Sequence, residues 1–240
     1  MSPIEKARQR PGSPGKSPAS SPLIVRTLGC IPYGVAWKAM RAFNEGRDAD
    51  SADELWLLEH PSVFTLGRAA SSRHLLAPGD IPVIQSDRGG QTTWHGPGQL
   101  VAYLLCDLRR AGSGVRRIVE SLEQAVIDML ESVSIRARRR LGAPGVYVEE
   151  SKIAAVGLRV SRNCTSHGVA INVDADLEPF SRIDPCGYPD LRVTRLVDLG
   201  VGWSVDETKR HFARFLAAQL GREIRQGSAK LPCALGSPPF

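Results

Sequence analysis

The chain has 240 residues, of which 42% are hydrophobic and 23% are charged, the composition of a globular protein long enough for one domain with a core. Its apolar stretches are too short to span a membrane. An aromatic content of 6%, without a basic and aromatic platform, argues against nucleic-acid binding. The formal net charge of +6 favours acidic partners.

The predicted elements are short strands and a few helices. In chain order they are a strand at 23–28, a helix at 35–47, strands at 54–59, 62–66, 82–86 and 99–107, a helix at 114–134, strands at 145–149, 152–161 and 167–174, and a last helix after Ser204. Ser204 and Glu207 form a capping box for that helix. Because strands dominate the middle and helices do not alternate with them, we expect an α+β fold with mixed β-sheets and flanking helices.

The ends of the chain differ in composition from its middle. Residues 1–22 are rich in Pro and Ser, with four basic residues against one acidic, which predicts a disordered basic tail. A mitochondrial transit peptide is the alternative for this tail, while a secretory signal would need an apolar segment. Residues 226–240 predict a loose C-terminal tail. We therefore expect a single domain at 23–225.

Five cysteines are present: Cys30, Cys106, Cys164, Cys186 and Cys233. The odd number and the lack of a CxxC pair argue against a disulfide framework. A reducing compartment is the default, so we expect a cytoplasmic protein unless the tail is a transit peptide.

A glycine-rich segment runs from Arg88 to Gln99 and holds four glycines. Such a segment lets the backbone approach a ligand and expose its N–H groups, with Arg88 and His95 as polar groups near its ends. A tight strand connection would also need glycines. From composition alone, a ligand-binding loop and a tight strand connection both remain open. The segment is neither a Walker A loop nor a dinucleotide-binding GxGxxG.

Lys152 follows a predicted turn at 149–151 and begins an apolar strand. A solvated turn lysine is the commoner case. If the side chain points inward, it can act as a base, and its ammonium form can stabilise a nearby thiolate.

Cys186 lies in a predicted loop between Pro185 and Gly187. Proline stiffens the chain and glycine gives access, so a nucleophilic thiol is a plausible alternative to a structural one. Cys164 and His167 have the spacing of half a zinc site, but no second pair follows, and we predict no metal. His60 before Pro61 is interpreted as structural. The sequence contains no GxSxG nucleophile elbow.

Together these segments resemble the lipoyl(octanoyl) transferase family from about residue 23 to residue 200. The resemblance rests on ordered blocks, which are 59–68, 88–99, 142–148, 152–160, 167–173, 185–187 and 193–194. One departure is Arg195, where the family usually has a small serine, and it could alter how the Cys186 loop is held. The resemblance implies a fold similar to the catalytic domain of biotin and lipoate protein ligases.

The resemblance also implies an activity and a set of site residues. Members move an octanoyl group from acyl carrier protein to a lysine of lipoyl domains, in 2-oxoacid dehydrogenases and the glycine cleavage H protein, as the first step of lipoate biosynthesis. Cys186 would carry the acyl thioester, and Lys152 would make that thiol more acidic and shuttle protons. The implied substrate-binding residues are Arg88, Gly89, Gly90, Gln91, Thr92, Thr93, Trp94, His95, Ala155, Val156, Gly157, Gly168, Val169 and Ala170.

The same resemblance implies octanoyl-acyl carrier protein and apo lipoyl domains as partners. No cofactor is expected, because the acyl group arrives on the carrier's phosphopantetheine, and we expect a monomer. Two rival functions stay open. An ATP-dependent lipoate or biotin ligase would need added basic residues where Gln91, Thr92 and Thr93 stand. A non-catalytic binder of acylated proteins would not need Cys186.

Overall fold

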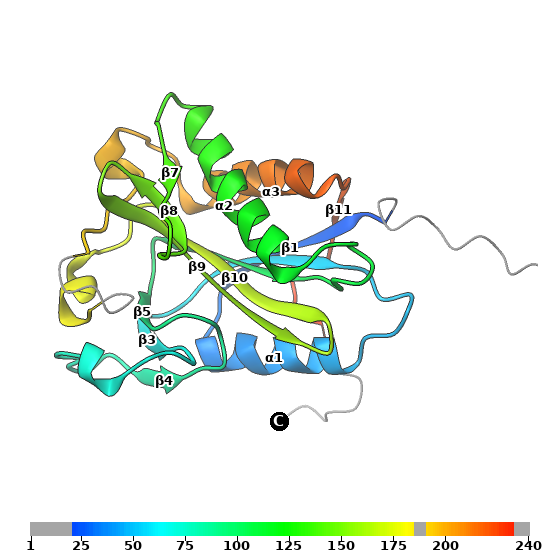
Figure 1. The fold of residues 1–240 in the computed structure, drawn as a ribbon, viewed down its shortest axis with the longest axis horizontal. Helices are drawn as coiled ribbons and strands as arrows, with labels where there is room; N and C mark the ends of the chain where they lie inside the picture. Colours follow the sequence, from blue (N-terminus) through cyan, green and yellow to red (C-terminus); the bar gives the residue numbers. More distant parts are fainter. Residues whose placement is uncertain (1–20, 185–190, 233–240) are drawn as a thin grey trace, which may run out of the picture.

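The computed structural model describes residues 21–184 and 191–232. An eight-stranded sheet forms its centre, in the order β11-β1-β2-β6-β10-β9-β8-β7, and a three-stranded sheet in the order β4-β3-β5 lies beside it. Helices α2 and α3 cover one face of the large sheet, while α1 and the small sheet lie on the other (Figure 1). The expected α+β fold with mixed sheets is confirmed. None of the helices in this part of the chain is long and apolar enough to cross a membrane.

The strands of the large sheet are β1 (Leu23–Cys30), β2 (Glu54–Glu59), β6 (Gln99–Leu105), β7 (Arg138–Arg139), β8 (Gly145–Val148), β9 (Ser151–Ser161), β10 (Cys164–Asn172) and β11 (Ile224–Gln226). Those of the small sheet are β3 (Val63–Leu66), β4 (Val83–Gln85) and β5 (Thr92–His95). The helices are α1 (Tyr33–Glu45), α2 (Val115–Glu131) and α3 (Val205–Leu220), with short 3₁₀ turns at Ser72–His74, Glu178–Arg182 and Val197–Leu199. β1 pairs in parallel with β2 and β11, and β2, β6, β10, β9, β8 and β7 pair in antiparallel fashion.

Strand β6 shows how one sequence supplies both faces of the sheet. All seven of its residues are buried. Leu100, Ala102 and Leu104 join the cluster under α2 and α3, while the alternate residues Val101, Tyr103 and Leu105 join the cluster under α1. A central strand covered on both sides therefore reads as a continuous apolar run.

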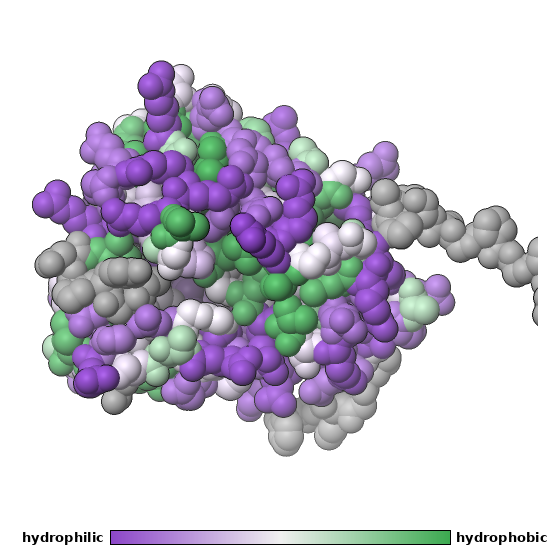
Figure 2. All heavy atoms as spheres, in the orientation of Figure 1, coloured by the Kyte–Doolittle hydropathy of each residue, from purple (hydrophilic) through white to green (hydrophobic). Residues whose placement is uncertain are grey.

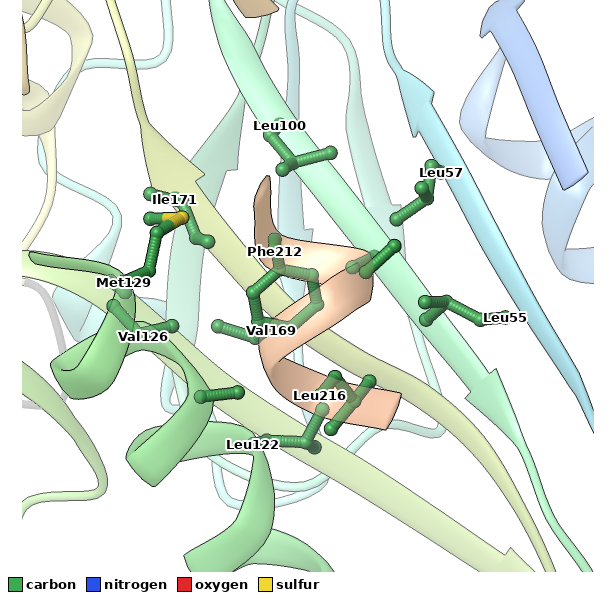
Figure 3. Packing of buried hydrophobic residues seen from close by; sticks show 14 of the residues in the cluster. Leu55, Leu57, Leu100, Leu122, Val126, Met129, Val169, Ile171, Phe212 and Leu216 are labelled. Atoms are coloured by element: carbon green, nitrogen blue, oxygen red, sulfur yellow. The ribbon is translucent and has the colours of Figure 1, made fainter. Parts of the chain in front are cut away.

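The core under α2 and α3 is made of aliphatic and aromatic side chains. Val126 and Met129 of α2 and Phe212 of α3 are fully buried against Leu100 and Ile171 of the sheet (Figure 3). Helix α3 begins at the predicted capping box, in which Ser204 and Glu207 each bond to the other's backbone N–H. The face seen in Figure 2 carries a band of hydrophobic residues bordered by hydrophilic ones.

Two predicted segments differ from the structure. The strand expected at 167–174 begins at Cys164, because the β9–β10 hairpin turns at Arg162 and Asn163, both with positive φ, and pairs Cys164 with Ser161. The glycine-rich segment is not loop throughout, since Thr92–His95 forms β5 and pairs with β3.

Candidate functional site

A pocket lies between the glycine-rich segment and the middle of β9 and β10; we call it the central pocket. The segment is held over β9 by the backbone N–H of Gly89, which donates to the Leu158 carbonyl at 2.9 Å. A Cβ on Gly157 would come within 2.9 Å of the Gly89 carbonyl oxygen. Two glycines are thus needed where the two backbones meet, and both line the pocket.

Thirteen of the fourteen residues predicted to bind substrate line this central pocket. They are Arg88, Gly89, Gly90, Gln91, Thr92, Thr93, His95, Ala155, Val156, Gly157, Gly168, Val169 and Ala170. Trp94 does not line it, because its ring packs in a separate cluster with Phe64 and Phe180. Its indole N–H donates to Ser62 Oγ at 2.8 Å. Trp94 therefore stabilises the glycine-rich segment without lining the central pocket.

Arg88 is buried and fixes the start of the glycine-rich segment. Its Nε donates to Thr65 Oγ1 at 3.0 Å, and its Nη1 donates to the Gly89 carbonyl at 3.0 Å. Nη2 also donates to the Thr65 carbonyl at 2.5 Å. The side chain thereby ties the segment to β3 of the small sheet.

Hydrogen-bonded aromatic side chains surround the central pocket on the α1 side of the sheet. The Tyr33 hydroxyl lies 2.5 Å from Ser86 Oγ and 3.2 Å from His167 Nε2. His60 Nδ1 donates to the Ile31 carbonyl at 2.6 Å, so its Nε2 accepts from the Tyr103 hydroxyl at 2.6 Å. His167 has a φ of 63°, a left-handed conformation that is costly outside glycine. The prediction that His60 is structural fits these bonds.

The histidines of this cluster are neutral near pH 7. Burial lowers the pKa of His60 to about 4 and that of His167 to about 4. Burial, followed by the nearness of His60, also holds the pKa of His95 well below its ordinary value. His95 Nδ1 donates to Gln99 Oε1 at 2.7 Å. A neutral ring that donates from Nδ1 keeps Nε2 as an acceptor.

A side-chain relay connects His95 with the segment next to Lys152. Gln99 Nε2 donates to Asn172 Oδ1 at 2.9 Å, and Asn172 Nδ2 donates to the Thr194 carbonyl at 3.0 Å. The Thr194 N–H in turn donates to the Lys152 carbonyl at 3.0 Å. The relay therefore joins the glycine-rich segment, β10 and the start of β9.

Lys152 is buried, with 4% of its surface exposed, rather than solvated. Its Nζ donates to the Pro144 carbonyl at 3.3 Å and lies 5.3 Å from the ring centroid of Tyr147. It lines a second pocket that shares Thr93, Ala155 and Ala170 with the central pocket. We call this the lysine pocket.

Cys186 lies outside the described residues, but both flanks of its segment are described. The Asp184 N–H donates to the His74 carbonyl at 2.9 Å, and the Lys152 N–H donates to the Arg192 carbonyl at 2.8 Å. Arg195, the departure noted in the sequence, donates from Nη1 to the Ala175 carbonyl at 2.9 Å and pairs with Asp198. The chain after residue 190 is thus fastened beside Lys152.

Sequence reasoning missed several residues that line the two pockets. These are Tyr33, Val101, Tyr103, Pro144 and Asn172, together with Phe180 and Val193. Three of them lie on predicted strands and the other four lie outside the predicted elements, so no local signal marked them as site residues. Among residues 21–184 and 191–232, no group of three or more His, Cys, Asp or Glu side chains is placed to hold a metal ion.

Comparisons with known proteins agree with this geometry. The model of the family described as the lipoyl protein ligase A/B catalytic domain matches residues 32–217. The octanoyltransferase of Thiobacillus denitrificans is 60% identical over 188 residues, covering 78% of this chain and 86% of that protein. The octanoyltransferase of Xanthomonas campestris pv. campestris is 54% identical over 208 residues, covering 87% and 90%.

Solved structures share the fold. A lipoate-protein ligase A bound with ATP superposes with a TM-score of 0.69 at 16% identity, covering 87% of this chain and 89% of that one. A bi-partite lipoate protein ligase from Thermoplasma acidophilum gives 0.69 at 17% identity, covering 87% of each. Fold and site thus define a catalytic domain of the lipoyl protein ligase A/B class. Within that class, the chain belongs to the octanoyltransferase family, whose members are acyltransferases.

Proposed function

We propose that the chain transfers an octanoyl group from acyl carrier protein to a lysine of apo lipoyl domains, through a thioester on Cys186. The observation that carries this proposal is the buried Lys152, fixed beside the chain that follows the Cys186 segment. An ammonium group in such a place stabilises a thiolate and can return a proton when the thiolate has reacted.

In the first half-reaction, the Cys186 thiolate attacks the carbonyl carbon of the carrier-bound thioester. A new carbon–sulfur bond forms, and the bond to the carrier's sulfur breaks. The carrier leaves as a thiolate and takes a proton from the Lys152 ammonium. One thioester replaces another, so this step is near neutral in energy.

In the second half-reaction, the neutral amine of the acceptor lysine attacks the acyl group on Cys186. The amine gives a proton to the neutral Lys152, the Cys186 thiolate leaves, and an amide forms. The amide is more stable than the thioester, which makes this step downhill. The ammonium and thiolate pair is restored, and protons balance over the cycle without a cofactor.

The two pockets offer a place for the acyl chain. Lys152 lines the lysine pocket, and Gly89 and Gly157 line the central pocket. Ala155 and Ala170, paired across β9 and β10, line both pockets with small apolar side chains. Each methylene buried along this path contributes roughly 0.8 kcal/mol to binding.

The partners follow from the same scheme. The donor is octanoyl-acyl carrier protein and the acceptor is a lipoyl domain; the Thermoplasma acidophilum ligase of the same fold is described with its E2 lipoyl domain. The +6 net charge of this chain suits acidic partners such as these.

Intact-mass analysis after incubation with octanoyl-acyl carrier protein tests the proposal. We expect an octanoyl adduct that maps to Cys186, forms without ATP, persists in Cys30→Ser and fails to form in Lys152→Ala. Cys30 is exposed and serves as the control thiol. Transfer that strictly needs ATP would support a ligase instead, and full transfer by Cys186→Ser would rule out the covalent route.

A further inference from the structure

The ring of Tyr147 lies next to the predicted catalytic lysine. The ring is buried, with 1% of the residue exposed. Lys152 Nζ lies 5.3 Å from the ring centroid, and the Tyr147 hydroxyl donates to the Ala143 carbonyl at 3.1 Å. The ring is therefore held in place at its polar end while its face meets the lysine head group.

A change of register in the β8–β9 hairpin brings these two residues together. Val146 pairs with Ala154, but its neighbour Tyr147 pairs with Lys152, so Ile153 is an extra residue on β9. Ile153 and Ala154 both join the core under α2 and α3, although neighbours in a regular strand point to opposite faces. The bulge shifts the alternation for Lys152, as bulges near active sites do.

An aromatic ring distinguishes the two forms of a lysine. The negative face of its quadrupole attracts an ammonium within about 6 Å, most strongly where water is excluded, whereas a neutral amine gains little. Lys152 Nζ meets both conditions, because it is buried and also donates to the Pro144 carbonyl. The ring face and the carbonyl oxygen are both contacts that an ammonium makes more strongly than a neutral amine does.

We propose that Tyr147 is a positioning residue that holds the ammonium form of Lys152 in the lysine pocket of the resting enzyme. This inference rests on the proposed function, in which that ammonium pairs with the Cys186 thiolate. Without the ring, a smaller fraction of the enzyme carries the ammonium and thiolate pair. The first half-reaction then slows, although every reacting group is present.

Other charged groups surround the hairpin, and the ring must act against their background. Arg140 lies over the same ring at 5.3 Å and pairs with Glu150 at 2.6 Å. Glu123 of α2 accepts from the Gly145 N–H at 2.8 Å and pairs with Arg139. Because substitution of Arg140 would remove a charge close to Lys152 as well as a contact of the ring, the ring itself is the better target.

The test replaces Tyr147 with phenylalanine and then with phenylalanines carrying one, two and three ring fluorines. Fluorine withdraws electrons and weakens the ring's attraction for a cation while hardly changing its size. Two quantities are measured in each variant: the rate of Cys186 acylation by octanoyl-acyl carrier protein, and the pH dependence of Cys186 alkylation by iodoacetamide.

We expect Tyr147→Phe to stay within about threefold of the wild type and each added fluorine to slow acylation further. The trifluorinated ring should lower the rate at pH 7 about tenfold and move the alkylation midpoint up by about one pH unit. Tyr147→Leu should move the midpoint at least as far. If it fails to fold, the fluorinated series still decides the matter.

A flat series, in both rate and midpoint, would overturn the role of the ring. A purely structural role predicts a lower melting temperature or a smaller reactive fraction with an unchanged alkylation midpoint. The proposed function is judged separately, since it fails if the wild-type enzyme forms no octanoyl adduct on Cys186.

Discussion

The two faces of the eight-stranded sheet are built from the same strands but from different kinds of side chain. Under α2 and α3 lies a large cluster of buried hydrophobic side chains, among them Leu100, Met129 and Phe212. On the opposite face, near the central pocket, the buried Tyr33 hydroxyl hydrogen-bonds to Ser86 and the buried His60 ring to the Tyr103 hydroxyl. The difference teaches that this fold separates stability from chemistry across one sheet, so substitutions on the two faces should fail in different ways.

The largest expected effect is on chemistry alone. Lys152→Met removes the group that exchanges protons in both half-reactions, and general acid–base groups contribute roughly 10²–10⁴-fold. We expect octanoyl transfer to fall about 10³-fold while the melting temperature changes little. Single-turnover transfer from octanoyl-acyl carrier protein measures it.

A second buried lysine provides the matched control. Lys209 of α3 is 3% exposed and donates to Asp206 Oδ1 at 2.8 Å, away from both pockets. Lys209→Met should leave the transfer rate of the folded protein within about twofold. Equal losses in the two variants would mean that the burial of a lysine, rather than the place of Lys152 in the lysine pocket, sets the activity.

The converse change acts on stability alone. Phe212 is fully buried between α3 and the sheet, and Phe→Ala substitutions in cores cost about 3–5 kcal/mol. Phe212→Ala should lower the free energy of unfolding in urea by that amount. The activity of the molecules that stay folded should be unchanged. The half-buried Phe215, on the same helix, should lose less on substitution by alanine.

Much of the fold follows from local pattern. The run at 54–59 forms β2 with its predicted bounds, and the capping box at Ser204 starts α3 where it was expected. Such elements depend on apolar periodicity and on hydrogen bonds between near neighbours. The two-residue β7 and three-residue β11 were missed, because so short a pairing at a sheet edge is fixed by tertiary contacts.

The candidate site, too, could be predicted only where local residues mark it. Local chemistry marked the glycine-rich segment and Lys152, and the resemblance supplied the set that lines the central pocket. Tyr33 and Asn172 were not found, because their roles depend on partners 53 and 22 residues away along the chain. The inward turn of Lys152 depends on a bulge that no periodicity revealed. Long-range pairing is what one sequence alone does not determine.

A fall in pH should destabilise the face of the sheet that carries the buried histidines before it affects the face under α2 and α3. His60 and His167 have a pKa of about 4 in the folded protein against about 6.5 when unfolded. The unfolded chain therefore binds more protons between these values, so stability is fully present above pH 6.5 and is lost as the pH falls toward 4. One unit of pKa difference corresponds to about 1.36 kcal/mol, so each histidine should lower the free energy of unfolding by roughly 3 kcal/mol over this range.

Urea unfolding at several pH values measures this loss. His60→Gln should make the dependence on pH shallower between 6.5 and 4, because one buried titrating ring is gone. His211 lies on α3, stacked on Trp203 and far from the cluster in sequence, and His211→Gln should leave the slope unchanged. If His60→Gln had the same dependence of stability on pH as the wild type, protonation of the buried histidines would not be the cause of the acid destabilisation.

The smallest expected effect concerns the relay that joins the two pockets. Asn172→Asp keeps the size of the side chain and can still accept from Gln99, but its carboxylate cannot donate to the Thr194 carbonyl. Loss of one buried hydrogen bond should cost about 1–3 kcal/mol of unfolding free energy. Because Thr194 pairs with the backbone of Lys152, acylation of Cys186 should also slow, by less than tenfold.

The exposed Asn163, in the β9–β10 turn, offers the same Asn→Asp change without a buried partner and should alter neither quantity. A loss of stability in Asn172→Asp without any loss of acylation rate would show that the relay supports the fold but does not position Lys152. A residue beside the pockets would then contribute to stability and not to chemistry.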